Sequence, residues 1–231
     1  MRASFSHKWE KGARAFDDRA MIRLPPHAPG MRIGLFGGSF DPPHEGHAHV
    51  SQVALQRLAL DRLWWLVTPG NPLKETACLP SLAQRIAAAQ KIARDPRIVV
   101  TGLEAEIGAR YTADTLRFLH RRCPGVRFVW IMGADNLLQF HRWRDWQEIA
   151  QTTPIAIVDR PGATFRAASA KAAQRYASAR LPESAAALLA DMPPPAFVYL
   201  HAPRVAQSST ALRNARLLAG AAPLPPEQRG P

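Results

Sequence analysis

Cysteine is scarce in this chain, because only Cys78 and Cys123 occur among its 231 residues. Two cysteines cannot build a disulfide framework, and neither belongs to a Cys-x-x-Cys pair of the kind that binds zinc. Long apolar runs are also missing, since none reaches the roughly 20 residues that a membrane-spanning helix needs. The first residues lack the apolar stretch and cleavage site of a secretory signal. These absences predict a protein of the reducing cytoplasm that does not span a membrane.

Acidic residues are outnumbered, since 18 Asp and Glu stand against 30 Lys and Arg, a net charge of +12. Such an excess attracts anions, among them nucleotides, phosphates, nucleic acids and acidic lipids. A general preference of the genome for arginine and alanine would produce the same excess, so the charge alone identifies no partner. The basic residues are scattered and accompany no helix-turn-helix, zinc or RNA-binding motif, which argues against a nucleic-acid-binding protein.

The chain has enough apolar residues, 47% of the total, to bury one cooperative core. We therefore expect a single domain over residues 31–219. Residues 1–30 are polar, mixed in charge and end in a proline-rich stretch. They predict a flexible extension, or a start assigned too early with Met31 as the true first residue. The proline-rich residues 220–231 are expected to form a disordered tail.

Short apolar runs alternate with stretches of helical periodicity between residues 31 and 218. This alternation predicts an α/β, Rossmann-like doubly wound fold, with a mainly parallel sheet and helices on both faces. In such sheets ligands bind beyond the carboxyl ends of the strands, where the strand order reverses. The expected strands are 32–37, 63–67, 97–101, 126–132, 155–158 and 197–200. The expected helices are 46–60, 82–93, 113–122, 167–189 and 210–218, with a short one after Asp135.

The segment GGSFDPPHEGH, residues 37–47, runs from the end of the first strand into a helix. Its two glycines allow the backbone to approach a phosphate closely, with N–H groups directed at it. The helix start adds partial positive charge at the same place. His44 and His47 can reach one side of that site. Either histidine could instead be a helix cap or a buried residue, and the pair finds no third ligand at metal spacing.

This segment resembles the signature of the adenylyltransferases that make the dinucleotide precursor of NAD, within the nucleotidyltransferase superfamily that carries an HxGH motif. Residues 208–213, SSTALR, are similar to the SSTxxR motif of that family. Lys74 follows the second strand, where the family places a basic residue near the phosphates. Residues 133–135 resemble its nucleotide-contacting G-x-D segment, although Asp135 also suits a helix N-cap.

Two further segments distinguish the bacterial nicotinate-nucleotide adenylyltransferases from sister enzymes that act on phosphopantetheine or other acceptors. Residues 110–116 resemble their segment ending in YTxDTL, and residues 140–146 resemble their FxxWxxW-like stretch. The resemblance implies that Trp143 stacks on the pyridine ring, whereas Trp146 is assigned to the core. Thr112 is expected to cap its helix, so that the following N–H groups can meet the pyridine carboxylate.

The resemblance implies that the 5′-phosphate of nicotinate mononucleotide displaces pyrophosphate from ATP in line, with Mg²⁺ held mainly through the phosphates of ATP. The residues expected to act in catalysis are His44, His47, Lys74 and Arg213. Those expected to contact ATP are Gly37, Gly38, Ser39, Phe40, His47, Gly133, Asp135, Ser208, Ser209, Thr210 and Arg213. Those expected to contact nicotinate mononucleotide are Ser39, Lys74, Tyr111, Thr112, Thr115 and Trp143. No residue is expected to ligate a metal directly.

Three alternatives stay open at this point: a sister enzyme with another acceptor, a basic nucleic-acid-binding protein, and a regulatory nucleotide-binding module without catalysis. The YTxDTL-like segment and Trp143 argue against the first, and retention of both His44 and His47 argues against the third. Assembly into a homo-oligomer is compatible with the family but is left undecided by the sequence.

Overall fold

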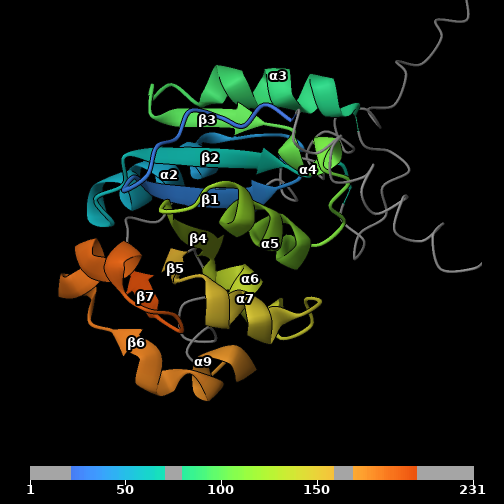
Figure 1. Ribbon diagram of the computed structural model, residues 1–231. Coiled ribbons are helices and arrows are strands. Elements are labelled where there is room, and N and C mark those ends of the chain that lie inside the picture. Colours follow the sequence, from blue (N-terminus) through green and yellow to red (C-terminus); the bar gives the residue numbers. More distant parts are fainter. Residues whose placement is uncertain (1–21, 71–79, 159–168, 202–231) are drawn as a thin grey trace, which may run out of the picture.

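The computed structural model describes residues 22–70, 80–158 and 169–201 (Figure 1). A seven-stranded sheet forms its centre, with the strand order β3-β2-β1-β4-β5-β7-β6. All adjacent strands run parallel. The strands are β1 (Arg32–Gly38), β2 (Arg62–Val67), β3 (Ile98–Thr101), β4 (Arg127–Gly133), β5 (Ile155–Val158), β6 (Arg180–Leu181) and β7 (Phe197–Leu200). The predicted doubly wound parallel fold is confirmed.

The helices connect the strands along the chain and cover the sheet. The α-helices are α2 (Glu45–Arg57), α3 (Leu82–Ile92), α4 (Leu103–Glu106), α5 (Thr112–Arg122), α6 (Ala134–Phe140), α7 (Trp146–Thr152) and α9 (Lys171–Arg175). Two 3₁₀ segments, η1 (Ala177–Ala179) and η2 (Glu183–Asp191), flank β6. In Figure 1, α5 lies in front of the sheet and α2 lies behind it.

Side chains that alternate along the strands form two separate cores, one on each face of the sheet. Trp64 points into the core that α5, α6 and α7 cover, whereas its neighbour Trp65 points into the core that α2 and η2 cover. Both indoles are fully buried. This alternation follows from the period of two along a strand, and burial of both faces explains why the strands are almost uninterrupted apolar runs.

The strand order reverses beside β1, because the chain proceeds from β1 to β2 and β3 on one side and then returns to β4 on the other. The connections that follow β1 and β4 therefore leave the carboxyl ends of these strands in opposite directions, and a crevice opens between them. This point of the sheet is where the glycine-rich segment 37–47 begins.

The Ala-rich stretch 167–189 is not the long helix that its composition predicts. From residue 169 onward it is divided into α9, η1, β6 and η2. Pro182 explains the break before η2, since proline cannot donate the helical hydrogen bond and drives the residue before it, Leu181, into extended backbone. That extended pair forms β6, which adds an edge strand beside β7.

Residues 22–30, expected within a flexible extension, pack on the domain. Ile22 and Leu24 contact the core under α5, and the ring of His27 meets Trp64 edge-on with centroids 6.1 Å apart. The backbone N–H of Gly30 donates to the carbonyl oxygen of Gly125 at 2.8 Å. The packed chain thus includes these nine residues ahead of Met31. The expectations for residues 1–21, the 210–218 helix and the 220–231 tail lie outside the described residues.

Candidate active site

A cavity of about 320 Å³ opens at the reversal of strand order. The loop after β1 forms one wall, the first turn of α5 forms another, and the connection from α6 to α7 forms a third. Its lining consists of Gly37, Gly38, Ser39, Thr68, Glu104, Arg110, Tyr111, Thr112, Trp130, Asn136, Arg142, Trp143 and Arg144. Six of the predicted site residues therefore share one cavity: the glycine pair, Ser39, Tyr111, Thr112 and Trp143.

Neighbouring side chains leave little space for a Cβ atom at Gly37 and Gly38. A Cβ on Gly37 would come within 2.8 Å of the Trp130 ring, and one on Gly38 within 3.3 Å of the Phe40 ring. The first separation is shorter than real Cβ contacts allow, so glycine at position 37 lets the Trp130 indole lie close against the end of β1. The absence of side chains also leaves the backbone of the loop accessible from the cavity, as the sequence predicted.

His44 and His47 lie at the start of α2, where each ring accepts a hydrogen bond from the backbone. Nδ1 of His44, the N-cap, accepts from Gly46 N at 3.1 Å, and Nδ1 of His47 accepts from His44 N at 3.2 Å. In a neutral imidazole an accepting nitrogen carries no proton, so both protons reside on Nε2. The helix start thus sets the tautomer of both rings, whose centroids are 3.9 Å apart.

Both histidines are buried, and His47 also packs on Phe40 with centroids 4.8 Å apart. Phe40 in turn stacks on Trp65 in the core. Phe40 was expected to contact ATP, and the structure places its ring in the core, with an exposed fraction of 1% and a φ of 47°. A contact of Phe40 with a ligand would therefore use its backbone. Neither histidine belongs to the cavity lining, which lies beyond Ser39.

The N-terminus of α5 faces the cavity without a side-chain cap. Tyr111, rather than Thr112, is the N-cap, and no side chain bonds to the first N–H groups. Thr112 is the first helical residue, which corrects the expectation that it caps the helix. The reason is local: Tyr111 is extended and its carbonyl accepts from Asp114 N at 3.0 Å, which closes the first turn. An uncapped helix start carries donors and partial positive charge suited to an anion.

Trp143 lines the cavity opposite α5, between two arginines. Its ring packs edge-on against Phe140 at 5.4 Å and Trp130 at 6.2 Å, and it is half-buried. The guanidinium of Arg144 lies over the Tyr111 ring, 4.9 Å from its centroid. Trp146 packs on Phe140 and Tyr176 away from the cavity, as its assignment to the core predicted.

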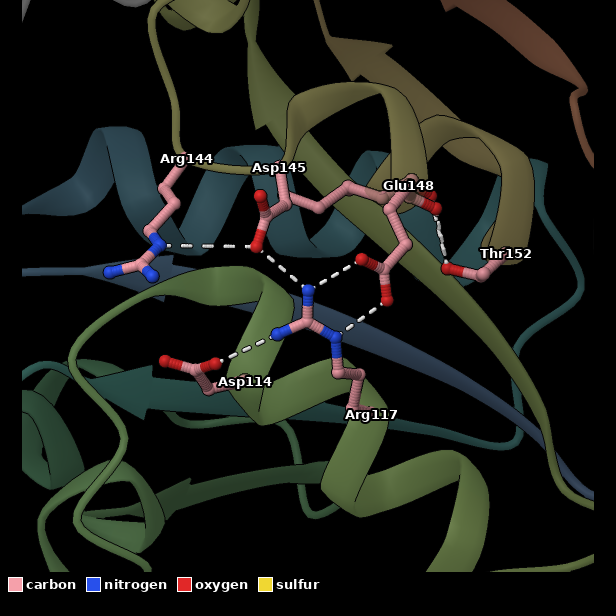
Figure 2. Close-up of polar contacts among 7 residues, drawn as sticks. Asp114, Arg117, Arg144, Asp145, Glu148 and Thr152 are labelled. Atoms are coloured by element: carbon pink, nitrogen blue, oxygen red, sulfur yellow. Dashed lines mark hydrogen bonds and ion pairs between the residues drawn. The ribbon is translucent and has the colours of Figure 1, made fainter.

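An ion-pair cluster around Arg117 ties the Trp143 connection to α5 (Figure 2). Arg117 donates from Nε to Glu148 at 2.6 Å, from Nη2 to Asp145 at 2.7 Å and from Nη1 to Asp114 at 2.9 Å. Asp145 ends the connection and adopts a left-handed φ of 52°. Glu148, and after it Asp145, raise the pKa of Arg117. The cluster holds the α6–α7 connection beside the first turns of α5.

Glu104 is a buried carboxyl at the base of the cavity that sequence reasoning missed. Its exposed fraction is 8%, and it accepts a hydrogen bond from Thr115 Oγ1 at 3.1 Å. Burial raises its pKa, while hydrogen bonds from Thr115 and Thr68 oppose the shift. Thr115, expected to contact the mononucleotide, is fully buried and reaches the cavity only through Glu104. Glu104 lies in none of the sequence motifs described above.

Other predicted residues lie apart from the cavity lining. Gly133 ends β4 and is the N-cap of α6, which makes Asp135 the second residue of that helix rather than its cap. Asn136, one residue further on, does line the cavity. The remaining predicted residues fall outside the described part of the chain: Lys74, Ser208, Ser209, Thr210 and Arg213.

The described residues hold no group of three or more His, Cys, Asp or Glu side chains placed to bind a metal ion. Within the same residues, no helix is long and apolar enough to cross a bilayer. The cavity is also lined by residues to which the motifs assigned no role: Thr68, Arg110, Trp130, Arg142 and Arg144.

Residues 35–215 match the model of the family described as Cytidylyltransferase-like. A protein of Methylorubrum extorquens named "Probable nicotinate-nucleotide adenylyltransferase" is 62% identical over 184 residues, covering 80% of this chain and all of that protein. One of the same name from Brucella suis is 55% identical, covering 81% of this chain and 96% of its own.

Among solved structures, the chain resembles Plasmodium falciparum nicotinic acid mononucleotide adenylyltransferase. The form complexed with APC gives a TM-score of 0.58, at 17% identity, over 80% of this chain and 83% of that one. The form complexed with NaAD gives 0.57 at the same identity and coverage. At this identity the likeness supports the fold alone.

Proposed function

The chain belongs to the nicotinate-nucleotide adenylyltransferase family, and on this premise we propose that it transfers the adenylyl group of ATP to nicotinate mononucleotide. The products are nicotinate adenine dinucleotide and pyrophosphate, in the biosynthesis of NAD. The observation that carries the proposal is one cavity that joins the glycine-rich phosphate loop to an uncapped helix start and to Trp143.

The reaction needs little covalent help from the protein. A phosphate oxygen of the mononucleotide is already ionised at neutral pH, so it attacks the α-phosphorus of ATP without a general base. The new P–O bond forms as the bond to the pyrophosphate oxygen breaks. Catalysis then depends on holding the two nucleotides in line and on donors directed at charge developing in the transition state.

The histidine pair supplies donors of fixed tautomer. Because Nδ1 of each ring accepts a backbone N–H, Nε2 of His44 and of His47 carries the proton. A neutral Nε2–H can donate to a phosphate oxygen without a change of protonation during turnover. We assign both rings to the phosphates of ATP, together with Lys74 and Arg213.

The mononucleotide is proposed to bind between α5 and Trp143. Its pyridine ring would stack on the indole, and its carboxylate would meet the N–H groups that follow Tyr111. Arg144, beside Tyr111, adds positive charge to the same wall. A carboxylate gains charge-assisted hydrogen bonds there, whereas an amide would turn an NH₂ group toward donors. The arrangement favours the acid over the amide.

Mg²⁺ is proposed to arrive with ATP. Mg²⁺ gives up its water shell reluctantly and in nucleotide-dependent enzymes is held largely through the phosphates of the substrate. Bound in this way, Mg²⁺ would shield the negative charge of the triphosphate. The residues of the chain orient the nucleotides and donate hydrogen bonds to the oxygens that remain.

The test uses purified protein, ATP and Mg²⁺ with four acceptors in parallel: nicotinate mononucleotide, its amide, phosphopantetheine and water alone. Pyrophosphate release and the mass of the product are followed together. We expect the dinucleotide from the acid, at a kcat/KM at least about tenfold above that of the amide, equivalent to about 1.4 kcal/mol. Turnover of phosphopantetheine instead would replace the proposal by the sister activity. A cytoplasmic location, a homo-oligomer and the absence of a nucleic-acid partner stay predictions.

A further inference from the structure

Arg85 is an arginine of α3 whose exposed fraction is only 3%. Its guanidinium donates to backbone carbonyl oxygens rather than to a carboxylate. Nη1 reaches Thr68 O at 2.7 Å and Ser39 O at 2.9 Å. Nε reaches Pro80 O at 3.1 Å, and Nη2 reaches Pro69 O at 3.2 Å. All four acceptors are main-chain oxygens, so these hydrogen bonds depend on the backbone conformation of the segments that Arg85 contacts.

Burying such a charge is costly. Removal from water lowers the pKa of Arg85, and the negative charge of Asp41 only partly opposes that shift. A hydrophobic residue at this position of α3 would avoid the desolvation cost. A buried guanidinium bound to carbonyls therefore has some use beyond filling space.

Three of the four acceptors belong to the segments that build the phosphate side of the cavity, and the fourth, Pro80, lies just before α3. Ser39 follows β1, and Thr68 and Pro69 follow β2; Ser39 and Thr68 both line the cavity. Thr68 N also donates to Gly38 O at 3.0 Å, so the two strand ends are already joined. Arg85 reaches across this junction from α3 and fixes both segments to one rigid helix.

Peptide geometry gives the bond to Ser39 a directional effect. The carbonyl of Ser39 shares a planar trans peptide with the N–H of Phe40, and in such a unit the two bonds point in opposite directions. With the oxygen turned to Arg85, the Phe40 N–H must point away from α3. The φ of 47° at Phe40 lies in a region that non-glycine residues rarely occupy, so this peptide needs an external restraint.

We propose that Arg85 is a positioning residue for the ATP phosphates: it binds the Ser39 and Thr68 carbonyls, which keeps these oxygens turned away from the anion and directs the loop N–H groups at it. This inference rests on the proposed adenylyl transfer and names the residue that prepares the phosphate loop for it. A carbonyl oxygen released toward the cavity would repel a phosphate oxygen, and a released peptide would lose its fixed donor.

The experiment compares Arg85→Lys and Arg85→Met with a matched control, Arg97→Met. Arg97 bonds to Asp95 on the surface beyond α3 and touches no cavity residue. Lysine keeps the positive charge but not the fork that spans several carbonyls, and it should stay folded if the methionine variant does not. Melting temperature, ATP binding by calorimetry without acceptor, and KM for each substrate are measured.

We expect both Arg85 variants to bind ATP at least about tenfold more weakly, about 1.4 kcal/mol, with a much smaller change in KM for the mononucleotide. A third variant, Arg85→Ala, leaves space for a guanidinium ion. A non-denaturing concentration of guanidinium chloride, but not of potassium chloride, should restore part of its ATP affinity. Arg97→Met should leave both substrates unaffected.

Two outcomes overturn the inference. One is wild-type ATP affinity in a folded Arg85→Lys variant. The other is an equal loss for both substrates that follows the fall in melting temperature and is not rescued by guanidinium, because that describes a residue of stability alone. Calorimetry of ATP binding does not depend on the acceptor, so failure of the wild-type enzyme to form dinucleotide would refute the proposed function separately.

Discussion

Replacing Arg117 by methionine should separate α5 from the connection that carries Trp143. The guanidinium bonds to three carboxylates, Asp114, Asp145 and Glu148, with side chains about 40% exposed. Exposed pairs contribute about 0.2–1 kcal/mol each, and the bidentate pair belongs near the upper end. Solvent screening and non-additivity reduce the sum to about 1–2 kcal/mol. For a domain of this size we expect the melting temperature to fall by about 2–8 °C.

The loss should also appear in substrate binding, since Asp145 lies two residues beyond Trp143. If about 1 kcal/mol of the lost energy had held this connection in place, KM for the mononucleotide should rise about fivefold, with KM for ATP nearly unchanged. Steady-state kinetics and thermal unfolding at low and high salt measure both effects. Salt screens the ion pairs of the wild type, so high salt should reduce the difference in melting temperature between wild type and variant.

The matched control is Arg57→Met, which removes an ion pair between α2 and η2 at Glu183, away from the cavity. It should lower the melting temperature slightly and change neither KM. The reasoning about Arg117 would be refuted by a variant with unchanged melting temperature and unchanged KM. An equal rise of both KM values would also refute it, because the cluster would then support the whole domain and not this wall of the cavity.

Three further predictions concern single side chains. His47→Ala should lower kcat by about 10²–10³ while ATP still binds, as expected for one lost donor to a transition-state oxyanion; a variant with half the normal kcat would remove His47 from the mechanism. Burial raises the pKa of Glu104, so the folded state holds this proton more tightly and stability is lost as pH rises from the ordinary carboxyl range through the folded pKa. The melting temperature of Glu104→Gln should thus rise relative to that of the wild type as pH increases. A difference between the two melting temperatures that does not change with pH would contradict this. Burial raises the pKa of Cys123 to about 11, so in a Cys78→Ser background a thiol reagent at pH 8 should react only after unfolding.

The sequence predicted the sheet and the cavity walls because their signals are local. A strand shows its period within a few residues, and the glycine pair and histidines lie in one short segment at a strand end. Arg85 and Glu104 were missed because their partners are distant in the chain. Arg85 binds carbonyl oxygens, which carry no sequence signal at all, and Glu104 meets Thr115 only after α5 has folded against the sheet.

Packing that lacks periodicity was also missed. The segment from Ile22 to Gly30 is rich in proline and shows neither helical nor strand spacing, so nothing in it indicated contact with Trp64 or Gly125. In the Ala-rich region, composition favoured a helix, but Pro182 interrupts it before η2. The cap of α5 was expected one residue too late, at Thr112, because side-chain preference pointed to threonine, whereas the extended backbone places the cap at Tyr111.

The placement of the indoles gives the protein an internal optical reporter. Trp64 and Trp65 are fully buried, Trp130 lines the cavity with an exposed fraction of only 2%, and Trp143 is half-buried in the cavity wall. In a Trp9→Phe, Trp146→Phe background, an iodide quencher should therefore reach Trp143 far more readily than these three indoles, and a mononucleotide stacked on Trp143 should shield it. Trp65 lies flat on Phe40, so a shift of the loop after β1 should alter a second, quencher-resistant part of the emission. Occupancy of each half of the site can then be followed by fluorescence without an added dye.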